Sequence, residues 1–389
     1  MFSKKIKPVS KIPGKFILCL LLISMAYSTI NAENVESSIK ILSFFFVSIL
    51  NYFILILTFR SIESIKTLLK WLIIIGFIFV SLNYFNFLQL SNFLPNTQKA
   101  YMVKSAIESQ TTAYTGIHSG STIIRKSFLW FDANSFGYLL ATLFLFNLYF
   151  LFYERKILIE SKYRYYLRYI IMFVFVISII FTLSRGAILA FLLSSIFVFL
   201  FFKNVVRIKI KYLVLLGIFF LIIITMFPYV SEKLLDLSDR MTLGIGLFGY
   251  SKSNTVLTGL ETGRLETALN AFYEFLERPV FGWGGGGRGK ISNTSNHVYY
   301  INLLGRWGIV GFSLYLSLYL IIISKALKSL KVAKNLNSSI YGLGIALLGI
   351  FLLVIIKGFF AEGNILFSGG LLIAYCNSVN QGNIKIKKG

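Results

Sequence analysis

The sequence predicts an all-α fold: a polytopic integral membrane protein with about ten transmembrane helices and one long extracytoplasmic loop that contains a short amphipathic helix. Hydrophobic residues make up 56% of the chain and charged residues only 14%, whereas soluble domains carry about 45–50% apolar and about 25% charged residues. Apolar runs long enough to cross a hydrocarbon core of about 30 Å recur along the whole chain. Basic residues gather in the short segments between these runs, as the positive-inside rule expects.

Each predicted span is an apolar run close to the roughly 20 residues that a membrane-crossing helix needs. The spans are residues 16–32, 39–59, 69–90, 134–153, 169–184, 186–202, 212–228, 298–323, 340–357 and 365–379. With the N-terminus inside, all predicted inner segments are basic, namely 1–15, 60–68, 154–168, 203–211, 324–339 and 380–389. Both termini are therefore expected in the cytoplasm.

The N-terminal segment has the order of a secretory signal, with lysines ahead of an apolar stretch from Phe16 to Ile30. Ile30 is a poor residue for a small-x-small cleavage site. We therefore expect an uncleaved first helix, and either alternative places the next segment outside.

Two long polar segments organise the chain. Residues 1–228 hold helices one to seven and include an outer loop, 91–133. Residues 229–297 form the longer extracytoplasmic loop, and 298–389 hold the last three helices and a basic cytoplasmic tail. Because long loops in compact proteins are usually functional or disordered, we expect the catalytic elements in 229–297.

The longer loop contains the predicted amphipathic helix, from Gly263 to Pro279. Its apolar residues recur at helical spacing, and its charged residues fall largely on the opposite side. The apolar set is Leu265, Ala268, Leu269, Phe272, Phe275 and Leu276, and the charged set is Glu266, Glu274, Glu277 and Arg278. We expect this helix to lie against the membrane-embedded body or at the interface.

Several classes of function are excluded by the distribution of residues. The net charge of +24 would suggest nucleic acid in a soluble protein, but here the basic residues follow the membrane topology. The two histidines and two cysteines have no metal-ligand spacing, so we expect no metal and no cofactor. The sequence also lacks a Ser-His-Asp order, a paired catalytic carboxylate motif and an intramembrane acidic relay.

Two arginines are candidates for binding an anion. Arg185 lies in a Ser-Arg-Gly turn between two apolar runs, where it either snorkels to headgroups or faces a cavity and holds a phosphate. Arg264 follows Gly263 at the start of the amphipathic helix. Helix N-termini favour anions, and guanidinium offers a two-pronged donor, although a solvated first-turn charge is the alternative.

A glycine-dense turn and a histidine follow this helix. The turn contains Trp283 and Gly284 and is flanked by Arg288. Glycine lets successive backbone N–H groups converge on an anion, whereas the alternative is a flexible linker. His297 follows Asn296 at the entrance to the eighth helix and is either a helix cap or a general base for an attacking hydroxyl.

Four short motifs, taken in order, resemble the O-antigen polymerase and O-antigen ligase superfamily of bacterial membrane glycosyltransferases, over roughly residues 120–320. They are Asp132-Ala133-Asn134; Ser184-Arg185-Gly186-Ala187; Gly263-Arg264 with Arg278-Pro279-Val280-Phe281-Gly282-Trp283-Gly284; and His297-Val298-Tyr299-Tyr300 with Gly308-Ile309-Val310-Gly311. The sequence departs from the family pattern at Val298, which replaces an Asn; Asn296 precedes the histidine instead.

The resemblance implies metal-independent, inverting glycosyl transfer on the outer face of the bacterial cytoplasmic membrane. The donor would be an oligosaccharide on undecaprenyl diphosphate. Arg185 and Arg264 would match the arginines that hold the diphosphate, and His297 the histidine near the acceptor. Substrate-binding residues are expected among these positions: Asn134, Trp283, Gly284, Arg288, Asn296 and Tyr300. A flippase and a chain-length regulator are the candidate partners, besides the lipid bilayer.

A repeat-unit polymerase for O-antigen or capsular polysaccharide is the leading hypothesis. The alternatives are a ligase to lipid A core with the same donor chemistry, a polysaccharide or lipid transporter, and a scaffold protein. A transporter would show related halves with a midplane site, and no repeated halves are present in the sequence. A scaffold would leave the outer arginines and His297 unexplained.

Overall fold

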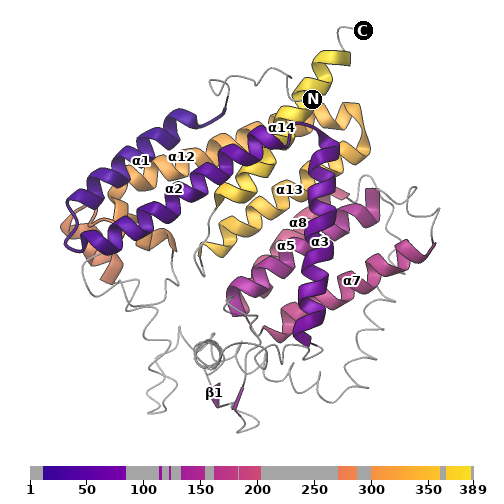
Figure 1. The fold of residues 1–389 in the computed structure, drawn as a ribbon, viewed down its shortest axis with the longest axis horizontal. Helices are drawn as coiled ribbons and strands as arrows, with labels where there is room; N and C mark the ends of the chain where they lie inside the picture. The colour runs from indigo at the N-terminus through magenta and orange to yellow at the C-terminus, as the bar shows by residue number, and fades with distance from the viewer. Residues whose placement is uncertain are drawn as a thin grey trace, which may run out of the picture. The chain divides into compact units, whose positions relative to one another are not determined.

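The computed structural model describes nine separate ranges of the chain: residues 12–84, 114–115, 122–123, 133–153, 162–182, 184–202, 270–286, 299–359 and 365–386. The described residues are mostly helical, with one two-residue β-hairpin (Figure 1). They divide into two compact units. The first comprises residues 1–66 and 262–389, and the second comprises residues 67–261. The described part confirms an all-α, polytopic membrane protein.

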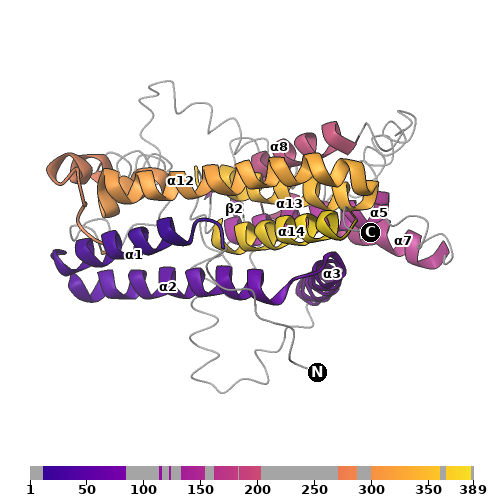
Figure 2. The same ribbon diagram turned by 90° about the horizontal axis from the view of Figure 1, so that it is seen from above.

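The first unit is a bundle of five long helices that run side by side (Figures 1 and 2). They are α1 (Lys15–Ile30), α2 (Val35–Thr58), α12 (Tyr299–Leu336), α13 (Ser338–Lys357) and α14 (Ile365–Ile386). Helix α1 packs against α2 and α12, α14 packs against α2, and α12, α13 and α14 pack against one another. Large side chains such as Tyr52, Tyr315 and Phe351 are fully buried among them.

The second unit contains a helical group and the hairpin. The helices are α5 (Ala133–Tyr153), α7 (Lys162–Phe181) and α8 (Arg185–Phe202), and α5 packs against both of the others. Strands β1 (Tyr114–Thr115) and β2 (Thr122–Ile123) are antiparallel, with Tyr114 opposite Ile123. Helix α3 (Ile62–Tyr84) begins in the first unit and continues into the second.

Nine of the predicted spans correspond to described helices, and the span 212–228 lies outside the described residues. By length and composition, α2, α3, α5, α12 and α13 are able to cross a membrane, while α1 and the apolar parts of α7 and α8 are shorter. The main differences from the predicted spans lie at the helix ends, where polar residues extend helices past the apolar run.

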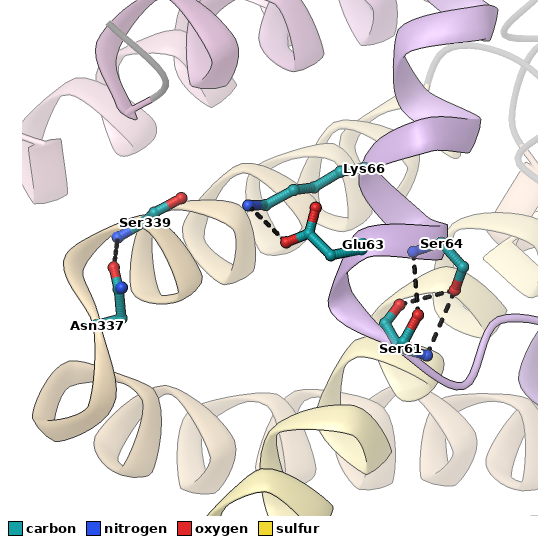
Figure 3. A network of polar contacts seen from close by, with 6 residues as sticks. All are labelled: Ser61, Glu63, Ser64, Lys66, Asn337 and Ser339. Carbon is teal, nitrogen blue, oxygen red and sulfur yellow. Dashed lines mark hydrogen bonds and ion pairs between the residues drawn. The ribbon is translucent and has the colours of Figure 1, made fainter. Parts of the chain in front are cut away.

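Helix α3 starts seven residues before the predicted residue 69 because serines cap it. The Ser64 N–H donates to Ser61 Oγ at 3.1 Å, and the Ser61 N–H donates to Ser64 Oγ at 3.3 Å (Figure 3). This reciprocal arrangement satisfies N–H groups that have no partner within the helix. The next residues, Glu63 and Lys66, form an ion pair at 3.1 Å on the first turns.

Helix α7 also starts early, at Lys162 instead of 169, and includes Arg168, which was predicted in an inner loop. Arg168 Nη1 donates to Asn147 Oδ1, and Asn147 Nδ2 donates to the Arg168 carbonyl oxygen, each at 2.8 Å. The guanidinium also lies 4.9 Å from the centre of the Phe150 ring. These contacts on α5 satisfy a buried amide and place a charged residue within the helix.

Residues 324–339 do not form the predicted loop, because α12 continues as a helix to Leu336 and α13 begins at Ser338. Asn337 is the single residue between them, and its Oδ1 accepts the N–H of Ser339 at 2.7 Å (Figure 3). The continuation is stabilised by packing, since Ala326, Leu330 and Ala333 are buried at i, i+4 and i+7. The lysines in residues 324–339 had led to the prediction of a loop.

Candidate functional site

One end of the first unit is organised by a break in α12 at Gly308, whose φ of 62° and ψ of −170° are not helical. In a continuous helix, the next two N–H groups would bond to carbonyls four residues earlier. Instead, the Ile309 N–H donates to the Pro279 carbonyl oxygen at 2.8 Å. The Val310 N–H donates to the Val280 carbonyl oxygen at 3.2 Å. The two N–H groups that the break releases therefore hold the segment that follows the amphipathic helix.

The carbonyls released by this break are used by the same segment. The Gly305 carbonyl oxygen accepts the Trp283 N–H at 3.0 Å, and the Arg306 carbonyl oxygen accepts the Gly284 N–H at 2.8 Å. Two helical hydrogen bonds are thus exchanged for four between residues 279–284 and α12. Because buried backbone groups must be paired, this exchange fixes the glycine-rich turn against the helix.

The glycines at this contact are required by conformation and by space. Gly282 and Gly284 have φ of 69° and 82°, values that residues with a Cβ rarely adopt. A Cβ at Gly282 would lie 2.5 Å from the Arg306 backbone, and a Cβ at Gly308 would overlap the Val280 carbonyl. Up to residue 286, the turn predicted as either an anion cradle or a flexible linker is therefore a packed, fixed segment.

Trp283 is the buried anchor of this segment, with 7% of its surface exposed. Its indole N–H donates to the Glu274 carbonyl oxygen at 2.9 Å. The Arg278 guanidinium lies 3.7 Å from the ring centre, and its Nη1 donates to the Asn31 carbonyl oxygen at 2.8 Å. Arg278 therefore links the turn to the connection between α1 and α2.

The end of α1 and the start of α2 hold the other side of the turn. Ser28 Oγ donates to the Phe281 carbonyl oxygen, and the Gly286 N–H donates to Ser38 Oγ at 2.8 Å. The rings of Tyr27 and Phe281 are 4.6 Å apart. Residues 278–286 thus lie between α12 and the first two helices, which brings segments about 250 positions apart in the sequence together.

Tyr300, predicted to bind substrate, belongs to a tyrosine cluster at the start of α12. Its hydroxyl donates to the Ile355 carbonyl oxygen of α13 at 2.8 Å and lies 3.3 Å from the Tyr319 hydroxyl. The neighbouring Tyr299 donates to the Tyr315 hydroxyl at 3.1 Å, and its N–H donates to the Gly358 carbonyl oxygen at 3.1 Å. These contacts fix the end of α12 that follows His297.

In the second unit, the Ser-Arg-Gly turn is the N-terminus of α8. Ser184 Oγ accepts the Ala187 N–H at 3.3 Å, which is an N-cap contact. Arg185 is then the first residue of the helix. A Cβ at Gly137 of α5 would lie 2.6 Å from the Ala187 Cβ, so the two helices approach closely here. Asn134, three residues before Gly137, lies one turn away along α5.

The remaining predicted site residues, Arg264, Arg288, Asn296 and His297, lie outside the described residues. Of the nine predicted positions, the first unit contains Trp283, Gly284 and Tyr300, and Trp283 and Gly284 lie in one segment. The second unit contains Asn134 and Arg185, which are placed here by backbone only. Their roles stay predictions.

The amphipathic helix differs in part from its predicted pattern. Residues 270–277 are helical, and the part before residue 270 lies outside the described residues. Glu274, expected on the charged face, is buried with 7% exposure, whereas Phe272 and Leu276 are 43% and 55% exposed. Glu274 thus contacts the body near Trp283, whereas Phe272 and Leu276 face outward and Glu277 is exposed as predicted.

The comparison with protein families adds an independent observation. Residues 170–316 match the family model described as O-antigen ligase. This match supports the resemblance to the O-antigen polymerase and ligase superfamily. A comparison with curated proteins finds no significant match. The superfamily match supports a function of the O-antigen polymerase or ligase type, a membrane glycosyltransferase-like enzyme, and a place in the bacterial inner membrane.

Eight of the nine predicted site positions lie within the O-antigen ligase match, and Asn134 lies before it. Sequence reasoning missed two further buried polar residues in the matched segment: Asn302 and Arg306 of α12, with 2% and 7% exposure. Arg306 is a charge two residues before the helix break. The sequence alone could have indicated Arg306, because it is the only charged residue between Tyr299 and Ser324.

Proposed function

We propose that the protein polymerises lipid-linked oligosaccharide repeat units into O-antigen or capsular polysaccharide. The reaction would be an inverting glycosyl transfer on the outer face of the cytoplasmic membrane, with an undecaprenyl-diphosphate-linked chain as donor. The observation that carries this proposal is the O-antigen ligase match over residues 170–316, which includes Arg185, Arg264 and His297.

The helix that begins at Arg185 supports the anion-binding part of the proposal. Its N-terminal N–H groups and its dipole favour negative charge, and Ser184 satisfies one of these groups through the Ala187 N–H. A guanidinium on the first residue adds a charge-assisted donor that suits phosphate oxygens. Arg185 is therefore proposed to bind the donor diphosphate.

The fixed glycine-rich turn and the start of α12 support the acceptor part. Residues 279–284 are bonded to the Gly308 break, and Tyr299 and Tyr300 bond to α12 and α13. His297 lies two positions before Tyr299, so its chain enters a constrained helix. Fixed surroundings favour catalysis, because a catalytic base must lie within hydrogen-bond reach of its proton.

The proposed chemistry balances without a metal. The acceptor sugar hydroxyl attacks the anomeric carbon of the donor, and the new glycosidic C–O bond forms as the C–O bond to the diphosphate breaks. The diphosphate leaves with the electron pair, and His297 takes the hydroxyl proton. Charge builds on the departing diphosphate, so fixed donors aimed at it lower the barrier; loss of one such donor costs roughly 10²–10³ in rate.

We also propose an orientation of the chain in the membrane and two partner proteins. Both termini would lie in the cytoplasm, since the basic segments then all face inward. A flippase would deliver the lipid-linked repeat unit to the outer leaflet, and a chain-length regulator would act with the polymerase.

A ligase that transfers the finished chain to lipid A core is the second candidate, because the matched family model is itself described as O-antigen ligase. Glycan gel analysis of a deletion strain separates the two. Loss of a polymerase leaves a single repeat attached to the core, whereas loss of a ligase leaves long lipid-linked polymer unattached. Complementation with the wild-type gene is the control, and unattached long polymer would contradict the polymerase.

A further inference from the structure

The C-terminal part of α12 carries a row of lysines on a rigid helix. Lys325, Lys328, Lys331 and Lys334 are all exposed, while the other side of the same turns is buried in the bundle at Ala326, Ser329, Leu330 and Ala333. No Asp or Glu occurs anywhere in α12. The positive charge of this part is therefore not neutralised along its own helix.

The length of α12 carries these lysines out of the hydrocarbon core. After the break at Gly308, the helix from Ile309 to Leu336 corresponds to roughly 42 Å at about 1.5 Å per residue, against a core of about 30 Å. The apolar sequence ends at Ile323, and the first lysine follows two positions later. The lysines therefore begin where the acyl chains give way to headgroups.

Two of the lysines continue the lipid-facing side of the helix. Leu320 and Leu327 are 60% and 48% exposed, as expected for side chains that face acyl chains. Lys331 and Lys334 follow at i+11 and i+14 from Leu320, which places all four residues on one helical face. Lys328 lies about a quarter turn away, and Lys325 lies almost opposite this face.

We propose that Lys331 and Lys334 form a binding site for the phosphate of an anionic phospholipid in the leaflet at this end of α12. The outward face passes without interruption from leucines to lysines, and a phospholipid presents acyl chain and phosphate in the same order. In the part of the chain that the structure describes, neither Lys331 nor Lys334 forms an ion pair with a carboxylate. Lysines close to the membrane surface attract anionic lipid.

A lipid fits this face better than a cytosolic protein does. A protein partner that covered Lys331 would also have to cover Leu327 one turn away, and the line of exposed leucines continues to Leu320 inside the apolar span. Acyl chains reach that depth, and a cytosolic surface does not. The proposal does not depend on the glycosyl-transfer chemistry.

Native mass spectrometry of the full-length, detergent-purified protein tests the proposal, with phosphatidylglycerol and phosphatidylcholine added at equal concentration. Each lysine near an anionic surface is worth about fivefold in binding, so the double variant Lys331→Gln/Lys334→Gln should lose about 25-fold in phosphatidylglycerol affinity. Binding of phosphatidylcholine should not change. The variant Lys331→Arg/Lys334→Arg keeps the charge and should retain binding.

The matched control is Lys325→Gln/Lys328→Gln, which removes the same charge from the same helix away from the leucine face and should lose less than fivefold. An equal loss in both double variants, or no loss in the first, would overturn the proposal. A photo-crosslinking residue at position 331 in cells should give lipid adducts. Adducts with protein instead of lipid would also overturn the proposal. This measurement does not depend on whether the glutamine variants fold.

Discussion

Replacement of Gly308 by alanine should disrupt the junction between α12 and the glycine-rich turn. The backbone at Gly308 has φ of 62° and ψ of −170°, a conformation that essentially only glycine adopts and that costs other residues about 1–3 kcal/mol. A Cβ would also overlap the Val280 carbonyl. This carbonyl cannot move freely, because it accepts the N–H of Val310.

The penalty includes the hydrogen bonds that depend on this geometry. Four backbone bonds join residues 279–284 to α12, and each is worth about 0.5–1.5 kcal/mol net. If alanine restores a continuous helix, two helical bonds form while these four are lost, a net loss of two bonds or about 1–3 kcal/mol. The backbone strain and the loss of bonds are alternative responses, so we expect Gly308→Ala to destabilise this end of the protein by about 1–3 kcal/mol in either case.

The assay is thermal unfolding of the detergent-solubilised protein, followed by the loss of a monodisperse peak on heating, with limited proteolysis around residue 283 as a local readout. Ser313→Ala is the matched control, because Ser313 is exposed on the same helix and surface changes usually stay within about 0.5 kcal/mol. Gly308→Ala should melt several degrees lower and be cut faster in the turn. Wild-type melting together with wild-type protection would refute the role of the break.

Three further outcomes follow from the same contacts. Arg278→Ala removes the stacking on Trp283 and the bond to the Asn31 carbonyl. Because Arg278 is exposed, this substitution should lower the stability by only about 1 kcal/mol. Arg278→Lys should restore part of this loss in the same melting assay, and a neutral effect of both variants would contradict the linking role. Ser184→Ala should remove the cap of α8, which lowers the stability by about 1 kcal/mol, and should shorten the glycan chains because Arg185 is disturbed. Ser184→Thr keeps the cap and should keep the chain length. Equal chain lengths for both variants would count against the cap. A cysteine in place of Glu277, which is exposed, should react with an impermeant thiol reagent in intact cells, and labelling only after lysis would overturn the proposed outer location.

The membrane-spanning part of the fold could be predicted from sequence because lipid imposes a strong rule: backbone groups must be satisfied within apolar helices of defined length. Polar extensions of these helices could not be predicted in the same way. Arg168 reads as a loop charge until Asn147, 21 positions earlier, is seen to bond to it. Lys325 to Lys334 read as a loop until the buried small residues between them show a packed helix.

For the candidate site, the sequence suggested candidate residues, whose roles stay predictions, but not how the described ones are held. The glycines of the turn were compatible with an anion cradle or a linker, and the choice depends on bonds to Gly305 and Arg306 that are remote in sequence. Gly285 is buried as well, and a Cβ there would lie against Ile41 and Trp307. Glu274 was assigned to solvent by periodicity, yet the indole of Trp283 bonds to its carbonyl and the residue is buried.

The proposed function requires that guanidinium groups bind a lipid-borne diphosphate. Glycan gels of a deletion strain that expresses Arg264→Ala test this requirement most directly. Wild-type and Arg264→Lys are the matched controls, and membrane fractions are blotted to confirm equal amounts of protein. Loss of one donor to the leaving group costs roughly 10²–10³ in rate. We predict that Arg264→Ala leaves a single repeat unit although the protein is present in the membrane. Wild-type chain lengths from Arg264→Ala would contradict the proposed function.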